Sequence, residues 1–253
     1  MGLRSIAILP ARLGSTRLPR KVLLAETGLP LFVHTAKAAA TCGGLSKVLI
    51  ATDAPEVVSA AEAHGFEALL TDANHQSGTD RVREALQKVA GEWDVVLNVQ
   101  ADEPDIHPGD LQRLIEAFED EGCEAATLGL PIENEADWQR PSVVKIVLDA
   151  RGQALYFSRA PIPNRLHARG ELEAPWGLRH IGVYAYRPSA LHRFCDLPPG
   201  KLEALENLEQ LRWLEHGGSM RVLPATRAPR GIDTQEDYAE FVARHGTRDT
   251  NGS

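Results

Sequence analysis

SIAILPARLGSTRLPRK, residues 5–21, runs from an apolar stretch straight into a loop with four cationic side chains. The apolar stretch, residues 5–11, is short and continuous, as is typical of a strand covered on both faces of a parallel sheet. The loop also carries Gly14 and two hydroxyl side chains. Because ligands of open α/β sheets bind at the carboxyl ends of the strands, this loop is a candidate site for an anionic group.

Strand and helix signals alternate through the first half of the chain. Further strands are expected at 47–53, 66–71, 94–100 and 124–130, and helices at 30–44, 54–65, 78–91 and 108–122. Such alternation predicts βαβ units, and therefore an α/β fold with a mostly parallel, doubly wound sheet of the Rossmann-like kind. Thr79 is a candidate N-cap for the helix at 78–91.

The second half inserts other elements into this sheet. We expect a hairpin at 142–159 with its turn at Asp149–Gly152, strands at 178–188 and 220–225, and helices at 188–195, 201–218 and after 231. In the second of these helices, four leucines recur at helical spacing and are expected in the core: Leu205, Leu208, Leu211 and Leu214. No linker or repeat divides the chain, so residues 1–245 are interpreted as one domain, and 246–253 as a polar tail.

The composition excludes several classes of protein. The 253 residues are 43% hydrophobic and 25% charged, which is typical of a globular chain, and the net charge of -8 disfavours a nucleic-acid-binding surface. Three widely spaced cysteines, Cys42, Cys123 and Cys195, favour a reducing cytoplasm over disulfides or a thiolate zinc site. No secretory signal or membrane span is expected.

Two groups of residues could bind a phosphate chain and its metal. In the loop, the four cations, Gly14 and the hydroxyls of Ser15 and Thr16 suit a polyphosphate, although neither common phosphate-binding fingerprint is present; the alternative is a solvated basic loop held by acidic neighbours. Asp102 follows the strand at 94–100, where a carboxylate could hold Mg²⁺ or simply form a turn. Asp233 could likewise bind Mg²⁺ or cap the last helix.

Other polar residues could border a small ligand. Ser77 and Gly78 could place backbone amides near a flat ring, and Arg81 could meet a phosphate or a carbonyl; the alternative is that this segment only starts a helix. His180 and Tyr184 share one face of a strand. Together with Arg159, Glu209 and Gln210 they would suit a hydroxylated acid, but Glu206, Glu209 and Arg212 would also fit a salt-bridged helix face.

Seven motifs resemble the 3-deoxy-manno-octulosonate cytidylyltransferase (CMP-Kdo synthetase) family, in that family's order and over nearly the whole chain. They are LPARLGSTRLPRKVL (9–23), HQSGTDR (75–81), NVQADEP (98–104), YFSRAPIP (156–163), LRHIGVYAYR (178–187), LEQLRWLEHG (208–217) and GIDTQEDY (231–238). The first is shared with other sugar-activating nucleotidyltransferases, and FSRAPIP, RHIGVYAYR and LEQLR are the specific ones.

The resemblance implies an activity and a role for each candidate. CTP and the acid sugar 3-deoxy-manno-octulosonate (Kdo) would give CMP-Kdo and pyrophosphate, for lipopolysaccharide synthesis in the cytoplasm. Arg12, Ser15, Arg17 and Lys21 would hold the triphosphate; Ser77, Gly78 and Arg81 would border the nucleotide; Asp102 and Asp233 would bind Mg²⁺; and Gln100, Arg159, His180, Tyr184, Glu209 and Gln210 would hold the sugar. Catalysis would fall to Lys21, Arg17, Asp102 and Asp233. Residues 1–130 would form the nucleotide half, and 131–245 the sugar half and the interface of a homodimer.

Two positions depart from the family pattern. Ala101 replaces a glycine of the acidic loop, which costs about 1 kcal/mol if the position needs a positive φ and nothing if it is extended. Arg20 also stands where glycine is frequent, and we assign it no role. Because the altered acidic loop would border the sugar site, the acceptor could be another acid sugar, such as a sialic-acid-like one. A non-catalytic nucleotide-binding regulator is the remaining alternative.

Overall fold

Apolar runs of the first half form parallel strands in the computed structural model, which describes residues 2–15, 17–165 and 175–246. β1 (Ser5–Pro10) lies between β2 (Lys47–Thr52) and β4 (Val95–Asn98), and β3 (Glu67–Leu70) pairs with the far side of β2. These pairs are all parallel. The chain order reverses at β1, so the loops after β1 and β4 leave neighbouring strand ends at the topological switch point of the sheet.

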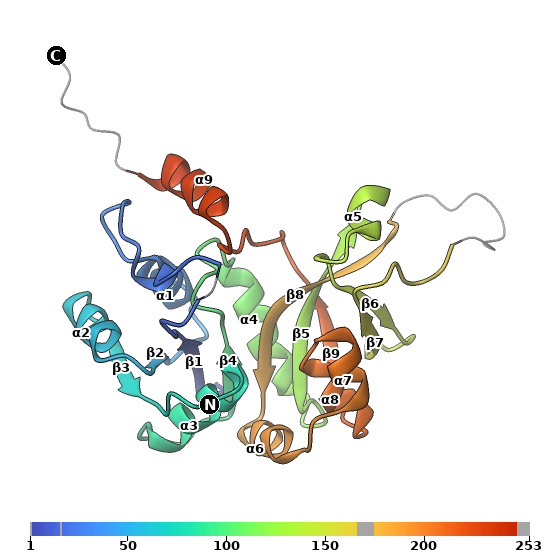
Figure 1. Ribbon diagram of the computed structural model, residues 1–253. Helices are drawn as coiled ribbons and strands as arrows, with labels where there is room; N and C mark the ends of the chain where they lie inside the picture. Colours follow the sequence, from blue (N-terminus) through green and yellow to red (C-terminus); the bar gives the residue numbers. More distant parts are fainter. Residues whose placement is uncertain (1, 16, 166–174, 247–253) are drawn as a thin grey trace.

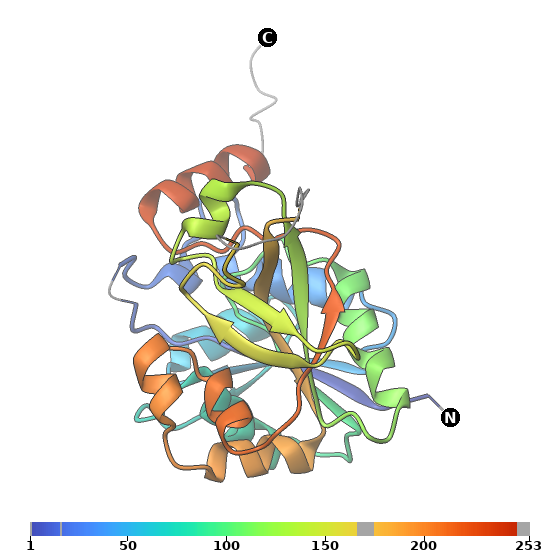
Figure 2. The same cartoon turned by 90° about the vertical axis from the view of Figure 1, so that its right-hand side faces the viewer.

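The second half extends this sheet with mixed pairing. β8 (Gly177–Tyr186) runs antiparallel between β4 and β5 (Ala125–Ile132), and β9 (Arg221–Pro224) pairs in parallel with β5. A hairpin of β6 (Lys145–Leu148) and β7 (Ala154–Ser158) joins the sheet through β6 and β8, and it lies in front of this half in Figure 2. The order through the described part of the chain is β3-β2-β1-β4-β8-β5-β9. The predicted α/β fold, with a mostly parallel sheet and an inserted hairpin, is confirmed.

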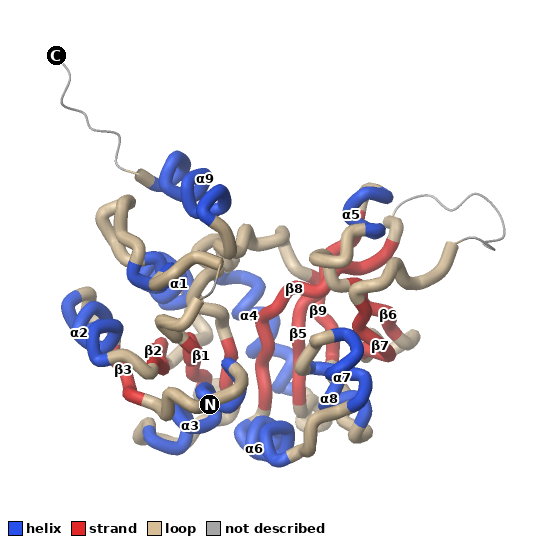
Figure 3. Tube along the Cα trace, viewed as in Figure 1, coloured by secondary structure: helices blue, strands red, loops and turns tan. Residues whose placement is uncertain are grey.

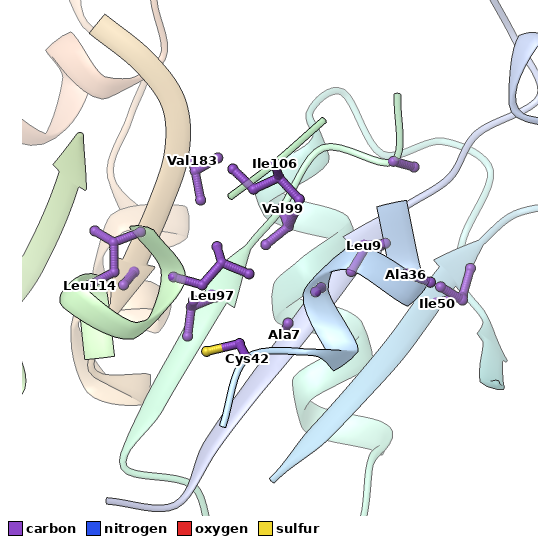
Figure 4. Close-up of a cluster of buried hydrophobic side chains, with 14 of the residues drawn as sticks. Ala7, Leu9, Ala36, Cys42, Ile50, Leu97, Val99, Ile106, Leu114 and Val183 are labelled. Carbon is purple, nitrogen blue, oxygen red and sulfur yellow. The ribbon is translucent and has the colours of Figure 1, made fainter. Parts of the chain in front are cut away.

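Helices cover both faces of this sheet, as Figures 1 and 3 show. They are α1 (Leu31–Ala40), α2 (Pro55–Ala63), α3 (Gly78–Lys88), α4 (Pro108–Glu116), α5 (Glu135–Gln139), α6 (Pro188–Asp196), α7 (Lys201–Glu206), α8 (Gln210–Glu215) and α9 (Gln235–His245), with 3₁₀ turns η1 (Lys21–Leu23) and η2 (Ala117–Glu119). Successive side chains of a strand point to opposite faces. Ala7 and Leu9 of β1 therefore belong to a buried cluster with side chains of α1, α2 and α4, and Figure 4 shows them with Ala36 of α1 and Leu114 of α4. Ile6 and Ile8 belong to a second cluster, with side chains of α3, α6 and α8.

Some local predictions were wrong. The N-cap of α3 is Ser77, whose Oγ accepts a hydrogen bond of 3.1 Å from the Asp80 amide, and Thr79 lies inside the helix. The predicted helix at 201–218 breaks at Asn207, whose φ of 53° is left-handed and ends α7. Because of this break Leu205 is 82% exposed and does not reach the core, whereas Leu208 and Leu211 are buried as predicted.

A small apolar cluster fixes the cationic loop against the last helix. Leu18 of the loop and Leu31 of α1 pack with Ile232, Tyr238 and Phe241. Residues more than 200 positions apart in sequence are thereby held together, and the segment before α9 lies beside the loop after β1. In the described residues, no helix has the length and apolar character needed to cross a bilayer.

Candidate active site

A cavity of about 270 Å³ opens beyond the ends of β1 and β4. It gathers the predicted phosphate-binding residues of the loop together with both predicted metal-binding carboxylates. Its lining is Pro10, Arg12, Ser15, Arg17, Lys21, Val22, Gln100, Ala101, Asp102 and Asp233. Three separate stretches of sequence therefore converge where the rule for α/β sheets places a ligand.

Lys21 lines this cavity and contacts both of its carboxylates. Its ammonium forms an ion pair with Asp102, and it donates hydrogen bonds to Asp233 Oδ1 at 3.0 Å and to the Ile232 carbonyl at 2.9 Å. The side chain is only 13% exposed. Burial lowers the pKa of Lys21, but the two carboxylates outweigh it and the pKa lies above its usual value. Lys21 is therefore a fixed positive charge.

Asp233 is not needed as a helix cap. The N-cap of α9 is Thr234, which forms a capping box with Asp237. The Asp233 carboxylate instead accepts from Lys21 and pairs with Arg17 at 3.0 Å. Its position thus favours a role in the cavity over the capping alternative.

The two departures from the family pattern differ in their backbone. Ala101 is not among the described residues with a positive φ, so its methyl group causes no strain there. Arg20 has a φ of 56°, the left-handed region in which glycine is favoured, and its guanidinium forms two hydrogen bonds to the Glu56 carboxylate at 3.0 and 2.8 Å. The glycine-like position is therefore Arg20, and its side chain is engaged outside the cavity lining.

A second cavity of about 170 Å³ adjoins the first. The two share Pro10, Arg12 and Gln100, and the second is completed by His75, Gln76, Ser77, Gly78, Arg81 and Glu209. A Cβ on Gly78 would lie 3.4 Å from the Pro10 ring, so the start of α3 lies close against the end of β1. Arg81 is buried and donates to Thr71 Oγ1 at 2.5 Å and to Asp53 Oδ2 at 3.2 Å. All three predicted nucleotide-bordering residues of this segment line one cavity.

Four of the predicted sugar-binding residues lie near one another between β8, α3 and α8. Tyr184 pairs in register with Asn98 of β4, and its ring centre is 5.3 Å from that of His180. Glu209 accepts from Thr79 Oγ1 at 2.8 Å and lies close enough to Tyr184 that its charge, after burial, raises the pKa of that phenol. Gln210 is 3% exposed, and its Nε2 has no hydrogen-bond partner in the described residues.

The charge states of this group follow from burial. Removal from water lowers the pKa of His180 to about 3, and His180 Nε2 lies 2.9 Å from Thr127 Oγ1. His180 is therefore a neutral imidazole at physiological pH, and Tyr184 is a protonated phenol. Both can form hydrogen bonds to a ligand, and neither supplies a charge.

Arg159 lies apart from both cavities, at the end of β7. Its guanidinium donates to the carbonyls of Glu206, Pro141 and Asn207 at 2.8, 3.2 and 3.3 Å. Lys145, fully buried, donates to the Arg159 carbonyl at 2.6 Å. The alternative of a salt-bridged face made of Glu206, Glu209 and Arg212 is not found. Glu206 accepts from Ser158 and the Arg159 amide, and Arg212 pairs with Glu203.

Glu103 was not among the predicted site residues, although it follows Asp102 directly. Its Oε2 is buried without a hydrogen-bond partner in the described part of the chain. Burial, and then the charges of Asp102 and Asp233, raise the pKa of Glu103 to about 8, although Lys21 opposes the shift. The sequence showed a carboxylate at this position, but not that the fold buries it beside two others.

The carboxylate pair matches the donor set that Mg²⁺ prefers. Asp102 and Asp233 already share one cation, the Lys21 ammonium. Within the described residues, no three His, Cys, Asp or Glu side chains lie close enough to hold a metal by themselves. Mg²⁺ is commonly bound by one or two carboxylates with phosphate oxygens and water. The pair therefore fits Mg²⁺ when a phosphate ligand supplies the remaining oxygens.

Comparisons with known proteins agree with this arrangement. A family model described as cytidylyltransferase matches residues 6–222. The 3-deoxy-manno-octulosonate cytidylyltransferase of Syntrophobacter fumaroxidans is 46% identical over 242 residues, covering 95% of this chain and 96% of that protein. The enzyme of the same name from Brucella anthropi is also 46% identical over 242 residues, covering 93% and 94%.

Solved structures give the same result. A CMP:2-keto-3-deoxy-manno-octonic acid synthetase complexed with CTP superimposes with a TM-score of 0.89 and 38% identity, over 95% of this chain and 98% of that one. The 4-diphosphocytidyl-2C-methyl-D-erythritol synthase of Anaerococcus prevotii, at 13% identity and a TM-score of 0.62 over 96% of this chain and 99% of that one, shares the fold alone. The chain therefore belongs to the cytidylyltransferase family and, within it, to the 3-deoxy-manno-octulosonate cytidylyltransferases.

Proposed function

We propose that this protein transfers CMP from CTP to the anomeric hydroxyl of Kdo, giving CMP-Kdo and pyrophosphate. Relatives 46% identical over almost their whole length are named for this activity, and a similar solved structure was determined with CTP. The observation that carries the proposal is the convergence of Arg12, Arg17 and Lys21 with Asp102 and Asp233 on one cavity.

The cations of the loop suit the triphosphate of CTP. Arg12 has no hydrogen-bond or ion-pair partner in the described part of the chain and lines both cavities, so it is available to a ligand that spans them. Arg17 is 66% exposed and can move from Asp233 to a phosphate at little cost. Lys21 is held in place by carboxylates and a carbonyl, which makes it a preorganised charge.

The reaction requires positioning and charge neutralisation more than covalent chemistry by the protein. The anomeric oxygen of the sugar attacks the α-phosphorus, the bond from this phosphorus to the oxygen that bridges to the β-phosphorus breaks, and pyrophosphate leaves with that oxygen. The hydroxyl proton is lost to solvent or to a nearby base. Bringing the reactants together and stabilising the developing negative charge supply most of the acceleration in such reactions.

Magnesium is the expected cofactor, held by Asp102 and Asp233. When bound, a divalent cation supplies neutralisation of phosphate charge. With Asp102 and Asp233 engaged by the metal, the Lys21 ammonium, still held by the Ile232 carbonyl, would donate to phosphate oxygens instead.

The sugar site would be formed by Gln100, Arg159, His180, Tyr184, Glu209 and Gln210. The neutral imidazole of His180 and the protonated phenol of Tyr184 suit the hydroxyl groups of Kdo. The unpartnered amide of Gln210 offers a further donor. Arg159 is the proposed partner of the sugar carboxylate and retains N–H groups beyond those given to the three carbonyls.

We also propose a homodimer formed through the second half of the chain, in the cytoplasm, with a product that serves lipopolysaccharide synthesis. Leu155 on β7 is exposed and would be covered in such a dimer. Sedimentation of the wild type and of Leu155→Asp tests the assembly, since a monomeric wild type contradicts it.

An acceptor screen tests the proposed function. Pyrophosphate release would be measured with CTP, Mg²⁺ and, in turn, Kdo, a sialic acid and other acid sugars. The rate should be highest with Kdo. A higher rate with another acid sugar would reassign the acceptor, and no release with any of them would contradict the enzymatic function.

A further inference from the structure

A third cavity lies away from the candidate active site. It encloses about 540 Å³ and is lined by Asp105, Arg227, Ala228, Arg230, Arg244 and His245. We call it the distal pocket. One wall is the loop after β4, a second is the segment that links β9 to α9, which runs below α9 in Figure 1, and the third is the end of α9. None of its residues lines either of the other two cavities.

The distal pocket has more positive charge than its own carboxylate can balance. Asp105 accepts from Arg244 Nη1 at 2.7 Å and lies 3.7 Å from His245 Nε2, so its charge is already shared. Arg227 and Arg230 are exposed, and in the described part of the chain neither has a hydrogen-bond or ion-pair partner. With the Asp105 charge matched to Arg244, two guanidinium groups remain uncompensated in a protein whose net charge is -8.

The two arginines stand on a segment that is fixed at both ends. Thr226 at one end donates its amide and hydroxyl to Asp110 Oδ1 at 3.0 and 2.6 Å. Ile232 at the other end donates its amide to the Asp102 carbonyl at 3.0 Å. The backbone that carries the two guanidinium groups is therefore already held at its ends before a ligand binds. This lowers the entropic cost of binding a ligand.

We propose that the distal pocket is a second binding site, for a small molecule that carries a diphosphate group. Guanidinium groups bind phosphate oxygens through two parallel hydrogen bonds, and two uncompensated ones match an anion with at least two charges. The volume lies in the range of small-molecule sites and exceeds what a single ion requires. Free pyrophosphate and the phosphate end of a nucleotide share this chemistry.

The distal pocket is separate from the candidate active site, and the proposal that it binds a diphosphate does not depend on the proposed cytidylyl transfer. Its walls nevertheless continue into the candidate active site. Asp105 follows Asp102 in the same loop, and Arg230 precedes Asp233 in the same segment. A ligand in the distal pocket would therefore contact residues of the same two segments that carry the two carboxylates.

The test uses the full chain, in EDTA, with a background variant that weakens the other phosphate-binding site. Arg12→Gln with Arg17→Gln removes two charges from the cationic loop. The distal-pocket variant adds Arg227→Gln and Arg230→Gln to this background. The control variant instead adds Arg151→Gln and Lys201→Gln, which remove the same charge at exposed positions outside all three cavities. Calorimetric titration with inorganic pyrophosphate and with ATP measures binding, and thermal melting checks that each variant is folded.

The background and control variants should bind at least one of the two probes. The distal-pocket variant should bind it at least tenfold more weakly, and hydrogen exchange of residues 225–233 should slow on binding only where Arg227 and Arg230 are intact. Binding of pyrophosphate supports a free diphosphate as the ligand, and binding of ATP alone supports a nucleotide. Equal affinity in the distal-pocket and control variants, or binding of neither probe to the background variant, would overturn the proposal.

Discussion

The Lys21 ammonium donates a 3.0 Å hydrogen bond to Asp233, a residue 212 positions later in the chain. The same ammonium pairs with Asp102, so one cation joins the loop after β1, the loop after β4 and the segment before α9. These three segments are far apart in the sequence. The three can meet only in the folded protein, and Lys21 is the point at which they do.

Lys21→Ala should lower kcat of CMP transfer by a factor of about 10²–10³, the typical cost of removing one preorganised charge-stabilising donor. Steady-state pyrophosphate release measures the rate, and circular dichroism checks the fold. Arg20→Gln is the matched control, because Arg20 is the neighbouring cation but pairs with Glu56; its kcat should stay within about twofold of the wild type, a change worth only about 0.4 kcal/mol. A Lys21→Ala enzyme with near-normal kcat would remove Lys21 from the catalytic residues.

Activity should require Mg²⁺ and should disappear in excess EDTA. Asp102→Asn and Asp233→Asn should each raise the Mg²⁺ concentration needed for half-maximal rate and lower kcat, because each removes one of the two carboxylates proposed to hold the ion. A magnesium titration of the rate measures both effects.

Asp237→Asn separates metal binding from helix capping. Asp237 accepts from the amides of Asp233 and Thr234 and so stabilises the start of α9. Its replacement should cost about 0.5–2 kcal/mol of unfolding free energy, as loss of a cap does, without a large change in the magnesium requirement. If Asp233→Asn behaved like Asp237→Asn, the metal role of Asp233 would be wrong.

The elements that were predicted from the sequence are those that leave a recognisable local pattern in it. The strands β1, β2 and β4 were predicted because burial on both faces leaves a continuous apolar run in the sequence. The break at Asn207 was not predicted, because nothing in the leucine spacing shows that one residue adopts a left-handed backbone. α5 was missed as well, since a five-residue helix is too short to display a helical period.

The same limit applies to the site. The loop after β1 and Asp102 were recognised as candidates because each follows a predicted strand, and ligands of α/β sheets bind at such strand ends. The position of Asp233 in the first cavity depends on how α9 packs on Leu18 and Leu31. This is a tertiary contact, which the local sequence does not show. Arg20 illustrates the converse, because the resemblance marked its position as glycine-like and the structure gives it a φ of 56°.

Arg159→Ala should raise the KM for Kdo or lower kcat/KM at least tenfold, a loss of about 1.4 kcal/mol. The substitution would remove the proposed charge-assisted pair with the sugar carboxylate and leave that carboxylate without a counter-charge. The KM for CTP should change by no more than about threefold, or roughly 0.6 kcal/mol. Steady-state kinetics with each substrate varied in turn provide the measurement. Weakened CTP binding with unchanged Kdo kinetics would show that the sugar carboxylate lies elsewhere.

Glu84→Gln should destabilise the fold in a pH-dependent way. Burial alone would raise the pKa of Glu84, but Lys88, the Asp72 amide and His75 outweigh it and lower the pKa to about 2. Since the folded pKa lies below the ordinary value of 4.5, this stabilisation is present above about pH 4.5 and is lost as the pH falls towards 2.

The cost of Glu84→Gln should be about 1.5–3 kcal/mol at pH 7, typical of a hydrogen bond to a charged group, and smaller at pH 3. Urea unfolding of both proteins at each pH gives the comparison. Because Glu84 also pairs with His75, which lines the second cavity, CTP binding should weaken in parallel. A difference in stability that did not change between pH 7 and pH 3 would contradict the assigned charge.

Phosphorus NMR of a single reaction mixture tests the proposed chemistry most directly. With CTP, Kdo, Mg²⁺ and the wild-type protein, the α-phosphorus signal of CTP should convert to that of a phosphodiester, CMP-Kdo, while the β- and γ-phosphorus signals merge into pyrophosphate in equal amount. In the same mixture with Lys21→Ala, the conversion should slow by at least tenfold. Formation of CDP and inorganic phosphate, or an unchanged CTP spectrum with the wild-type protein, would contradict cytidylyl transfer at this site.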